Sequence, residues 1–194
     1  FEMMIQQNGG QFFDRQGRIV INSPECLQAI RLIRKMLEAG ITVNEELYTH
    51  AHYASLKNDS VATYPMAVWW GGSIKDYAPE TKGDWGVFRL PALEPGGLRV
   101  SNSGGSALVI PEQCKNKEAA WAFVKFVLCT PKIQNVQYKK YDLMPCLIPA
   151  FDDPFYDQPD EFFAGQKVRK VFVKEIEKIH PLNRNADWME AFGW

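Results

Sequence analysis

Two short glycine-containing segments carry residue types suited to holding a small polar ligand. They are Gly71-Gly72-Ser73 and Gly104-Gly105-Ser106, and each lies beside a segment that we expect to be a strand. Because glycine has no Cβ, a ligand can approach the backbone closely and bond its N–H groups and the serine hydroxyls. The alternative use is structural, since turns are the commonest place for glycine. Neither segment matches a dinucleotide-binding or P-loop pattern.

An aromatic pair, Trp69-Trp70, directly precedes the first of these segments. If both residues lie on a strand, their rings point to opposite faces, because side chains alternate along a strand. One ring would then pack in the core, and the other would line a cleft and stack on a flat apolar face of a ligand. Alternation does not decide which ring does which, and burial in the core explains either one.

Residue types that serve catalysis or metal binding are not arranged for those purposes. His50 and His52 are two positions apart, which does not suit a zinc pair on a helix, and His180 stands alone. The acid pairs Asp152-Asp153 and Asp160-Glu161 could serve a glycosidase, but in a proline-rich segment we interpret them as solvated turn residues. No Gly-x-Ser-x-Gly motif occurs. We expect no enzyme, no metal and no cofactor; a carbohydrate-active hydrolase is the rival within the enzyme class.

Charge and composition indicate a neutral partner. Among 194 residues, 22 Lys and Arg nearly balance 23 Asp and Glu, so no net field gathers nucleic acid or an anionic membrane. The six tryptophans suit sugar rings as well as core packing. No stretch approaches the roughly 20 apolar residues that span a bilayer. The four cysteines form no Cys-x-x-Cys motif, which gives a zinc site no support and leaves disulfides open.

The elements that must position these residues alternate between strand and helix signals. Strands are predicted at 64–70, 85–88 and 107–110, where apolar and aromatic residues cluster. The proline- and glycine-rich stretch at 91–97 is the best candidate for a crossing between lobes. The order predicts a mixed α/β protein.

Helix start signals are clear at three places. Ser23-Pro24-Glu25 supplies an N-cap, a proline at the first helical position and an early acid, and Gly40 ends that helix. Asn116 caps a second helix, and Thr130-Pro131 opens a third. The apolar faces of the first two comprise Leu27, Ile30, Ile33 and Leu37, and Ala120, Phe123, Val124 and Val127.

Four further segments have simpler predictions. A hairpin-like excursion is expected at 12–21, and an extended surface connection at 144–159. Residues 187–192 look helical, in a chain that begins at Phe1 and that we expect to be a piece of something longer. A last long amphipathic helix is expected to carry Val168, Phe172, Ile176 and Ile179.

A series of short motifs runs in order through nearly the whole chain. They include Asn8-Gly9-Gly10-Gln11-Phe12-Phe13-Asp14, Ile21-Asn22-Ser23-Pro24-Glu25, Met66-Ala67-Val68-Trp69-Trp70-Gly71-Gly72-Ser73, Trp85-Gly86-Val87 with Leu90-Pro91-Ala92, Ser103-Gly104-Gly105-Ser106-Ala107-Leu108, Ala119-Ala120-Trp121-Ala122-Phe123 and Phe162-Phe163-Ala164-Gly165-Gln166. No single motif is diagnostic. In this order they resemble the sugar-binding class of bacterial extracellular solute-binding proteins, family 1, of ABC transporters.

The resemblance implies a periplasmic-binding-protein-like type II fold, a Venus flytrap of two α/β lobes that close over a sugar and dock on an import permease. This chain would be mostly the C-terminal lobe, in segments 1–97 and 151–194, with 98–150 returning to the N-terminal lobe. Without that partner half, apolar faces built from Leu108, Phe123 and Val127 would be exposed, which predicts self-association. The implied location is extracytoplasmic, periplasmic or on the cell surface, with a lipid anchor or the permease as the link to the membrane.

The resemblance also implies a ligand site. It places 70–73 at the cleft on the second lobe and 102–106 opposite it on the first. Many members carry a sugar-stacking tryptophan directly after Gly-Ser, where this chain has Ile74, so another aromatic residue must supply that face. The candidate ligand-binding residues are Trp69, Trp70, Gly71, Gly72, Ser73, Tyr77, Asn102, Ser103, Gly104 and Gly105. Two alternatives stay open: another small solute, and a docking module that holds no solute.

Overall fold

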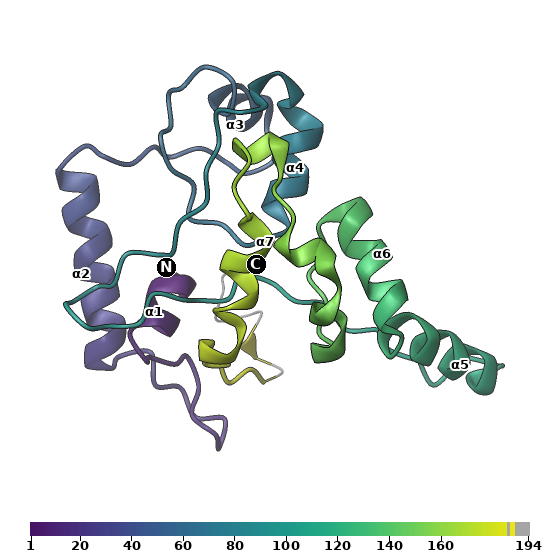
Figure 1. Cartoon of the computed structure of the whole chain (residues 1–194). Helices are drawn as coiled ribbons and strands as arrows, with labels where there is room; N and C mark the ends of the chain where they lie inside the picture. Colours follow the sequence, from purple (N-terminus) through teal and green to yellow (C-terminus); the bar gives the residue numbers. More distant parts are fainter. Residues whose placement is uncertain (186, 189–194) are drawn as a thin grey trace. The chain divides into compact units, whose positions relative to one another are not determined.

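The computed structural model of the chain describes residues 1–185, 187 and 188 (Figure 1). Over these residues the backbone forms seven α-helices and five short 3-10 helices. The α-helices are α1 (Glu2–Gln7), α2 (Pro24–Glu38), α3 (His50–Ser55), α4 (Trp70–Tyr77), α5 (Lys117–Leu128), α6 (Pro131–Tyr141) and α7 (Val168–Val173); the 3-10 helices are η1 (Pro79–Thr81), η2 (Ile148–Asp152), η3 (Pro154–Asp157), η4 (Glu161–Phe163) and η5 (Ile176–Lys178). No helix in this part of the chain is long and apolar enough to cross a membrane.

The three strands predicted at 64–70, 85–88 and 107–110 are absent from the described residues, where β-pairing is limited to two isolated bridges. This prediction was wrong because a strand needs a neighbouring backbone to pair with, and a run of apolar residues does not supply one. At 85–88 a side chain takes that place. The Gln166 amide accepts a hydrogen bond from Val87 N–H (2.7 Å) and donates one to Val87 C=O (2.6 Å). The α/β character expected of the lobes is therefore not confirmed.

The chain divides into two compact units, each with its own buried cluster. The first unit comprises Phe1–Leu47, Phe88–Ser103 and Glu175–Trp194, and the second comprises Tyr48–Val87 and Gly104–Lys174. The boundaries at 97 and 150, which concern the lobes of a whole solute-binding protein, stay a prediction.

In the first unit, α2 begins as predicted. The Ser23 hydroxyl accepts a hydrogen bond from Cys26 N–H (3.3 Å), and Pro24 is the first helical residue. The apolar side expected for α2 remains exposed at Leu27, Ile30 and Leu37. The helix buries only its Cys26 and Ala29 face, because it packs against a cluster that also contains Ile5, Phe12 and Phe13.

The hairpin-like excursion at 12–21 is confirmed. Phe13 and Ile19 form an antiparallel bridge, and Asp14 N–H donates to Arg18 C=O across the turn (2.9 Å). Gly17 supplies the positive φ (+79°) that closes it.

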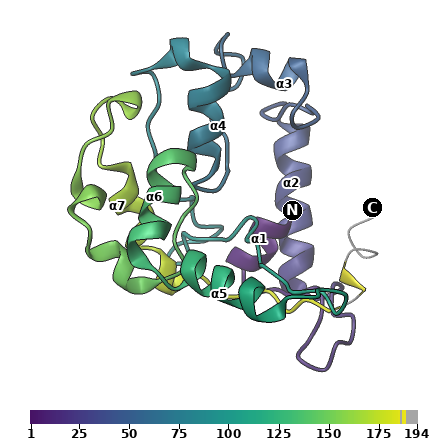
Figure 2. The same cartoon turned by 90° about the vertical axis from the view of Figure 1, so that its right-hand side faces the viewer.

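In the second unit, α5 and α6 form a helical pair that both views show (Figure 1, Figure 2). Both begin as predicted, since the Asn116 side chain accepts from Ala119 N–H (3.0 Å) and α6 starts at Pro131. No residue of α5 is buried. Leu108 and Phe123 are exposed and Val127 is half-buried, so the exposed apolar surface predicted here is present. Self-association through it stays a prediction.

Two predictions for the last third of the chain need correction. Segment 144–159 is not an extended surface connection, because it forms η2 and η3 and buries Ala150 and Tyr156. Asn135 of α6 holds it by donating to Ala150 C=O (2.9 Å) and accepting from Tyr156 Oη–H (2.7 Å). The long last helix is broken, since α7 ends at Val173 and only the short η5 follows. Most of the helix expected at 187–192 lies outside the described residues.

Candidate functional site

The segment expected to be a glycine loop after Trp70 is instead the first half of a helix. Trp70 N–H donates to Ala67 C=O, and α4 then continues through Gly71, Gly72 and Ser73 to Tyr77. The two glycines allow other parts of the second unit to approach the helix closely. A Cβ on Gly71 would lie 3.4 Å from Phe163 Cζ, and one on Gly72 would lie 3.2 Å from Asp142 Oδ2. Tertiary packing therefore overrides the turn preference of a Gly-Gly pair.

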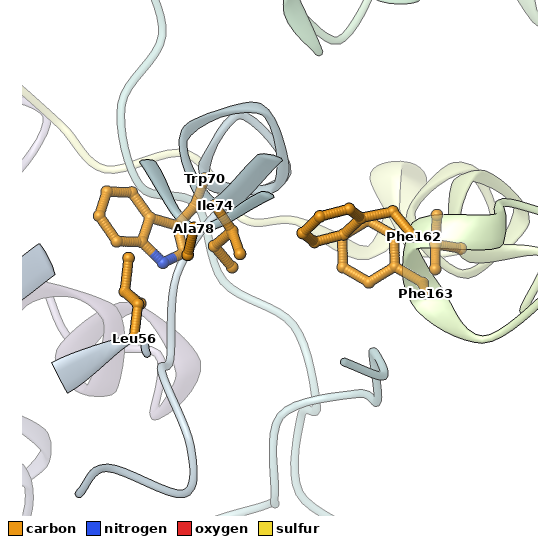
Figure 3. Close-up of a cluster of buried hydrophobic side chains, with 7 residues drawn as sticks. Leu56, Trp70, Ile74, Ala78, Phe162 and Phe163 are labelled. Carbon is orange, nitrogen blue, oxygen red and sulfur yellow. The ribbon is translucent and has the colours of Figure 1, made fainter. Parts of the chain in front are cut away.

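The two tryptophans have different environments. Trp70 is buried with Leu56 and Ile74 in the cluster that also contains Phe162 and Phe163 (Figure 3). Trp69 is only partly buried, and its ring lies edge-on to that of Trp70, with centroids 5.9 Å apart at 88°. Successive helix residues point about 100° apart, so neighbours need not share a face. Trp70 is thus the core ring of the pair, and Trp69 is the one that remains accessible.

Ile74 occupies a core position. It is buried beside Trp70 and Ala78 in the same cluster (Figure 3). An aliphatic side chain fits there because the neighbouring rings already fill the space around it. The departure from the family pattern at this position therefore serves packing in the second unit.

The second glycine segment lies at one of the points where the chain passes from one unit to the other. It has no regular secondary structure, and Gly104 and Gly105 have φ values of +101° and +113°, which favour glycine strongly. Gly104 approaches the accessible tryptophan, since a Cβ on it would lie 3.5 Å from Trp69 Nε1. Asn102 and Ser103 belong to the first unit, where Gln6 Oε1 accepts a hydrogen bond from Asn102 N–H (2.6 Å). The structure thus brings Trp69 and Gly104 together within the second unit.

Tyr77 is not grouped with Trp69. It lies at the C-terminal end of α4 and stacks on Tyr53 of α3, with ring centroids 3.9 Å apart at 21°. It lines a hollow of about 630 Å³ with Tyr48, His50 and Lys57. An aromatic face is present here, but at the other end of the helix.

A buried ionic cluster on the second unit was missed by sequence reasoning. Lys75 Nζ lies 3.2 Å from both Asp142 Oδ2 and Asp160 Oδ2, and Arg169 Nη2 lies 2.8 Å from Asp160 Oδ2. Burial raises the pKa of the Asp142 carboxyl, although Lys75 opposes this. Asp160 is therefore a buried ion-pair residue and not the solvated turn residue that we expected. The residues next to Asp160 in the sequence do not indicate this role, because its partners Arg169 and Lys75 are 9 and 85 residues away.

Two further candidate catalytic residues, Asp153 and His52, have structural contacts. Asp153 caps η3 by accepting from Phe155 N–H (2.9 Å), which lowers the pKa of its carboxyl. His52 is buried against the rings of Tyr64 and Trp70. All four cysteines are free thiols. In the described residues no group of three or more His, Cys, Asp or Glu side chains is placed to hold a metal ion.

Known proteins resemble this chain over nearly its whole length. It is 29% identical over 196 residues to the arabinooligosaccharide-binding protein of Bacillus subtilis (strain 168), covering 97% of the chain and 45% of the relative. It is 23% identical to the lactose-binding protein of Rhizobium radiobacter, covering 93% and 43%. The chain thus spans about half the length of the curated relatives it matches.

The fold is also shared with a solved structure. This is the ABC transporter associated binding protein from B. animalis subsp. lactis Bl-04 in complex with beta-1,6-galactobiose, with a TM-score of 0.77 at 16% identity over 94% of this chain and 48% of that chain. At this identity the likeness concerns the fold alone. The family model for bacterial extracellular solute-binding proteins matches residues 1–164. The chain belongs to the bacterial extracellular solute-binding protein family.

Proposed function

We propose that this chain is part of a protein that captures a carbohydrate outside the cytoplasm and delivers it to an ABC import permease without chemical change. The observation that carries the proposal is the family match over residues 1–164. The relatives add the ligand class, since one is named an arabinooligosaccharide-binding protein and another a lactose-binding protein. A further relative, from Streptococcus pneumoniae, is named a maltooligosaccharide solute-binding lipoprotein, which supports a lipid anchor as the link to the membrane.

The ligand contact we favour is the accessible ring of Trp69. Its partly exposed ring supplies an apolar face on which a sugar ring can stack, and the backbone of Gly104 lies beside it. Asn102 and Ser103 stay candidate contacts. Ser73 stays a candidate contact beside Trp69, and Tyr77 stays a candidate contact at the other end of α4. The burial of Trp70 and the close packing at Gly71 and Gly72 support structural roles.

The α5–α6 surface fits a place against the other half of a whole binding protein. It exposes Trp121, Phe123 and Phe126, and a surface of this kind is covered in a stable protein. This supports the return of 98–150 to the N-terminal lobe, with self-association as the consequence when that half is absent. A docking module without solute is the alternative function.

Isothermal titration calorimetry with the full-length protein tests the proposal. Arabinotriose, lactose and β-1,6-galactobiose are titrated into wild type, Trp69→Ala and Trp69→Phe, with thermal melting as a check on folding. We expect saturable binding of at least one sugar, weakened about tenfold or more by Trp69→Ala and largely retained by Trp69→Phe, because stacking needs a ring face. No binding of any sugar by wild type would refute carbohydrate capture and favour the docking module.

A further inference from the structure

A second aromatic surface lies on the same unit as Trp69 and is not explained by the core. The hollow of about 630 Å³ is bounded by the N-terminal end of α3 and the C-terminal end of α4. Its volume falls in the range of small-molecule sites. Tyr48 and Tyr77 line it with 58% and 48% of their surface exposed, so both rings can meet a ligand.

Each of the tyrosine rings that line the hollow contacts another aromatic ring. Tyr77 stacks on Tyr53, so each ring of this pair covers one face of the other. Tyr48 has a φ of +66°, which is rare for a bulky residue, and its ring lies edge-on to the buried Trp70 at 6.3 Å. A conformation of this kind persists only where surrounding contacts impose it, and such conformations cluster at ligand-binding positions.

The charge at the hollow favours a neutral ligand. Its lysine, Lys57, has Nζ 2.9 Å from Glu80 Oε1, so the positive charge is already balanced. An anionic ligand would have to compete with that carboxylate. The rest of the lining consists of three tyrosine rings together with Thr49, His50 and Ala54. The tyrosine rings and their hydroxyl groups match the apolar face and the hydroxyl rim of a sugar ring.

We propose that the Tyr48–Tyr77 hollow is a second carbohydrate-binding site, separate from the contact at Trp69. Trp69 and Tyr77 are eight residues apart along α4, which corresponds to about 12 Å of helix. One pyranose cannot reach both rings at that separation, so the two rings would hold different sugar units. The proposal rests on the proposed function for the class of ligand, but not for the existence of the hollow.

Saturation-transfer-difference NMR on the full-length protein, with β-1,6-galactobiose and arabinotriose as probes, tests the second site. Trp69→Ala removes the first contact, and the double variant Trp69→Ala/Tyr77→Ala removes both. We expect Trp69→Ala to keep a residual saturable signal that the double variant loses. The combination of Trp69→Ala with Tyr77→Phe keeps the signal, because the ring is retained. Trp69→Ala/Tyr141→Ala is the matched control, because Tyr141 is an exposed tyrosine of α6 away from the hollow.

The outcomes separate the two proposals. Binding by wild type that Trp69→Ala abolishes completely would overturn the second site alone. A residual signal that survives in the folded Trp69→Ala/Tyr77→Ala and Trp69→Ala/Tyr48→Ala variants would also overturn the second site alone. Absence of any signal in wild type would overturn both the second site and the proposed function. Thermal melting of each variant distinguishes loss of a site from loss of the fold.

Discussion

Replacing Asp160 with asparagine removes one negative charge from the centre of the second unit. The side chain is 10% exposed and pairs with Arg169, whose side chain is 11% exposed. The substitution Asp160→Asn keeps the shape of the side chain and the Oδ1 that accepts from Phe162 N–H, but it replaces the Oδ2 that accepts from Lys75 and Arg169 by an uncharged donor. Breaking a buried pair from one side costs about 3–5 kcal/mol. Lys75 keeps Asp142 as a partner and is partly exposed, so we expect the lower end, about 3 kcal/mol.

Urea unfolding measures this loss. Tryptophan fluorescence reports mainly on the second unit, which contains Trp69, Trp70, Trp85 and Trp121. With a slope of about 1–3 kcal/mol per molar urea, the midpoint should fall by about 1 M or more. The control is Asp157→Asn, which removes an exposed ion pair with Lys170 and should leave the midpoint unchanged. Equal midpoints for the two variants would refute the claim that burial makes the Asp160 charge important.

Two further predictions concern the same region. Gly71→Ala should be neutral or slightly stabilising, because alanine is the better helix former and Phe163 can adjust. Gly72→Ala should be less stable than Gly71→Ala by about 1–2 kcal/mol, because its Cβ meets the partly buried Asp142. Equal urea midpoints for the two variants would contradict this. The pKa of the Asp142 carboxyl is raised in the folded state, so the folded protein binds a proton more readily than the unfolded chain does. Ionisation of Asp142 therefore lowers stability above the ordinary pKa of about 3.9, and the loss disappears as the pH falls. The stability of Asp142→Asn relative to wild type should be greatest near pH 7 and should shrink towards pH 4 in urea titrations; a pH-independent difference would show that the carboxyl does not titrate in this way.

Features that depend on a few neighbouring residues could be predicted from the sequence. Ser23 and Asn116 cap helices as expected, and Pro131 opens α6, because a cap or a first-turn proline acts on N–H groups within three residues. The turn at Gly17 follows for the same reason. The family could also be predicted from the sequence, because the order of motifs along the chain does not depend on how they pack.

Features that depend on distant residues appeared only when the chain was folded. Gly71 and Gly72 lie in a helix against which Phe163 and Asp142 pack. The residues next to the two glycines in the sequence do not indicate those contacts. The predicted strands lacked pairing partners, and at Val87 a glutamine side chain took the partner's place. Asp160 is buried because cations 9 and 85 residues away reach it. Strand pairing, burial and charge compensation depend on residues far apart in the sequence, whereas helix capping depends on neighbouring residues. For this reason the helix caps could be predicted from the sequence, and the strand pairing and the buried ion pairs could not.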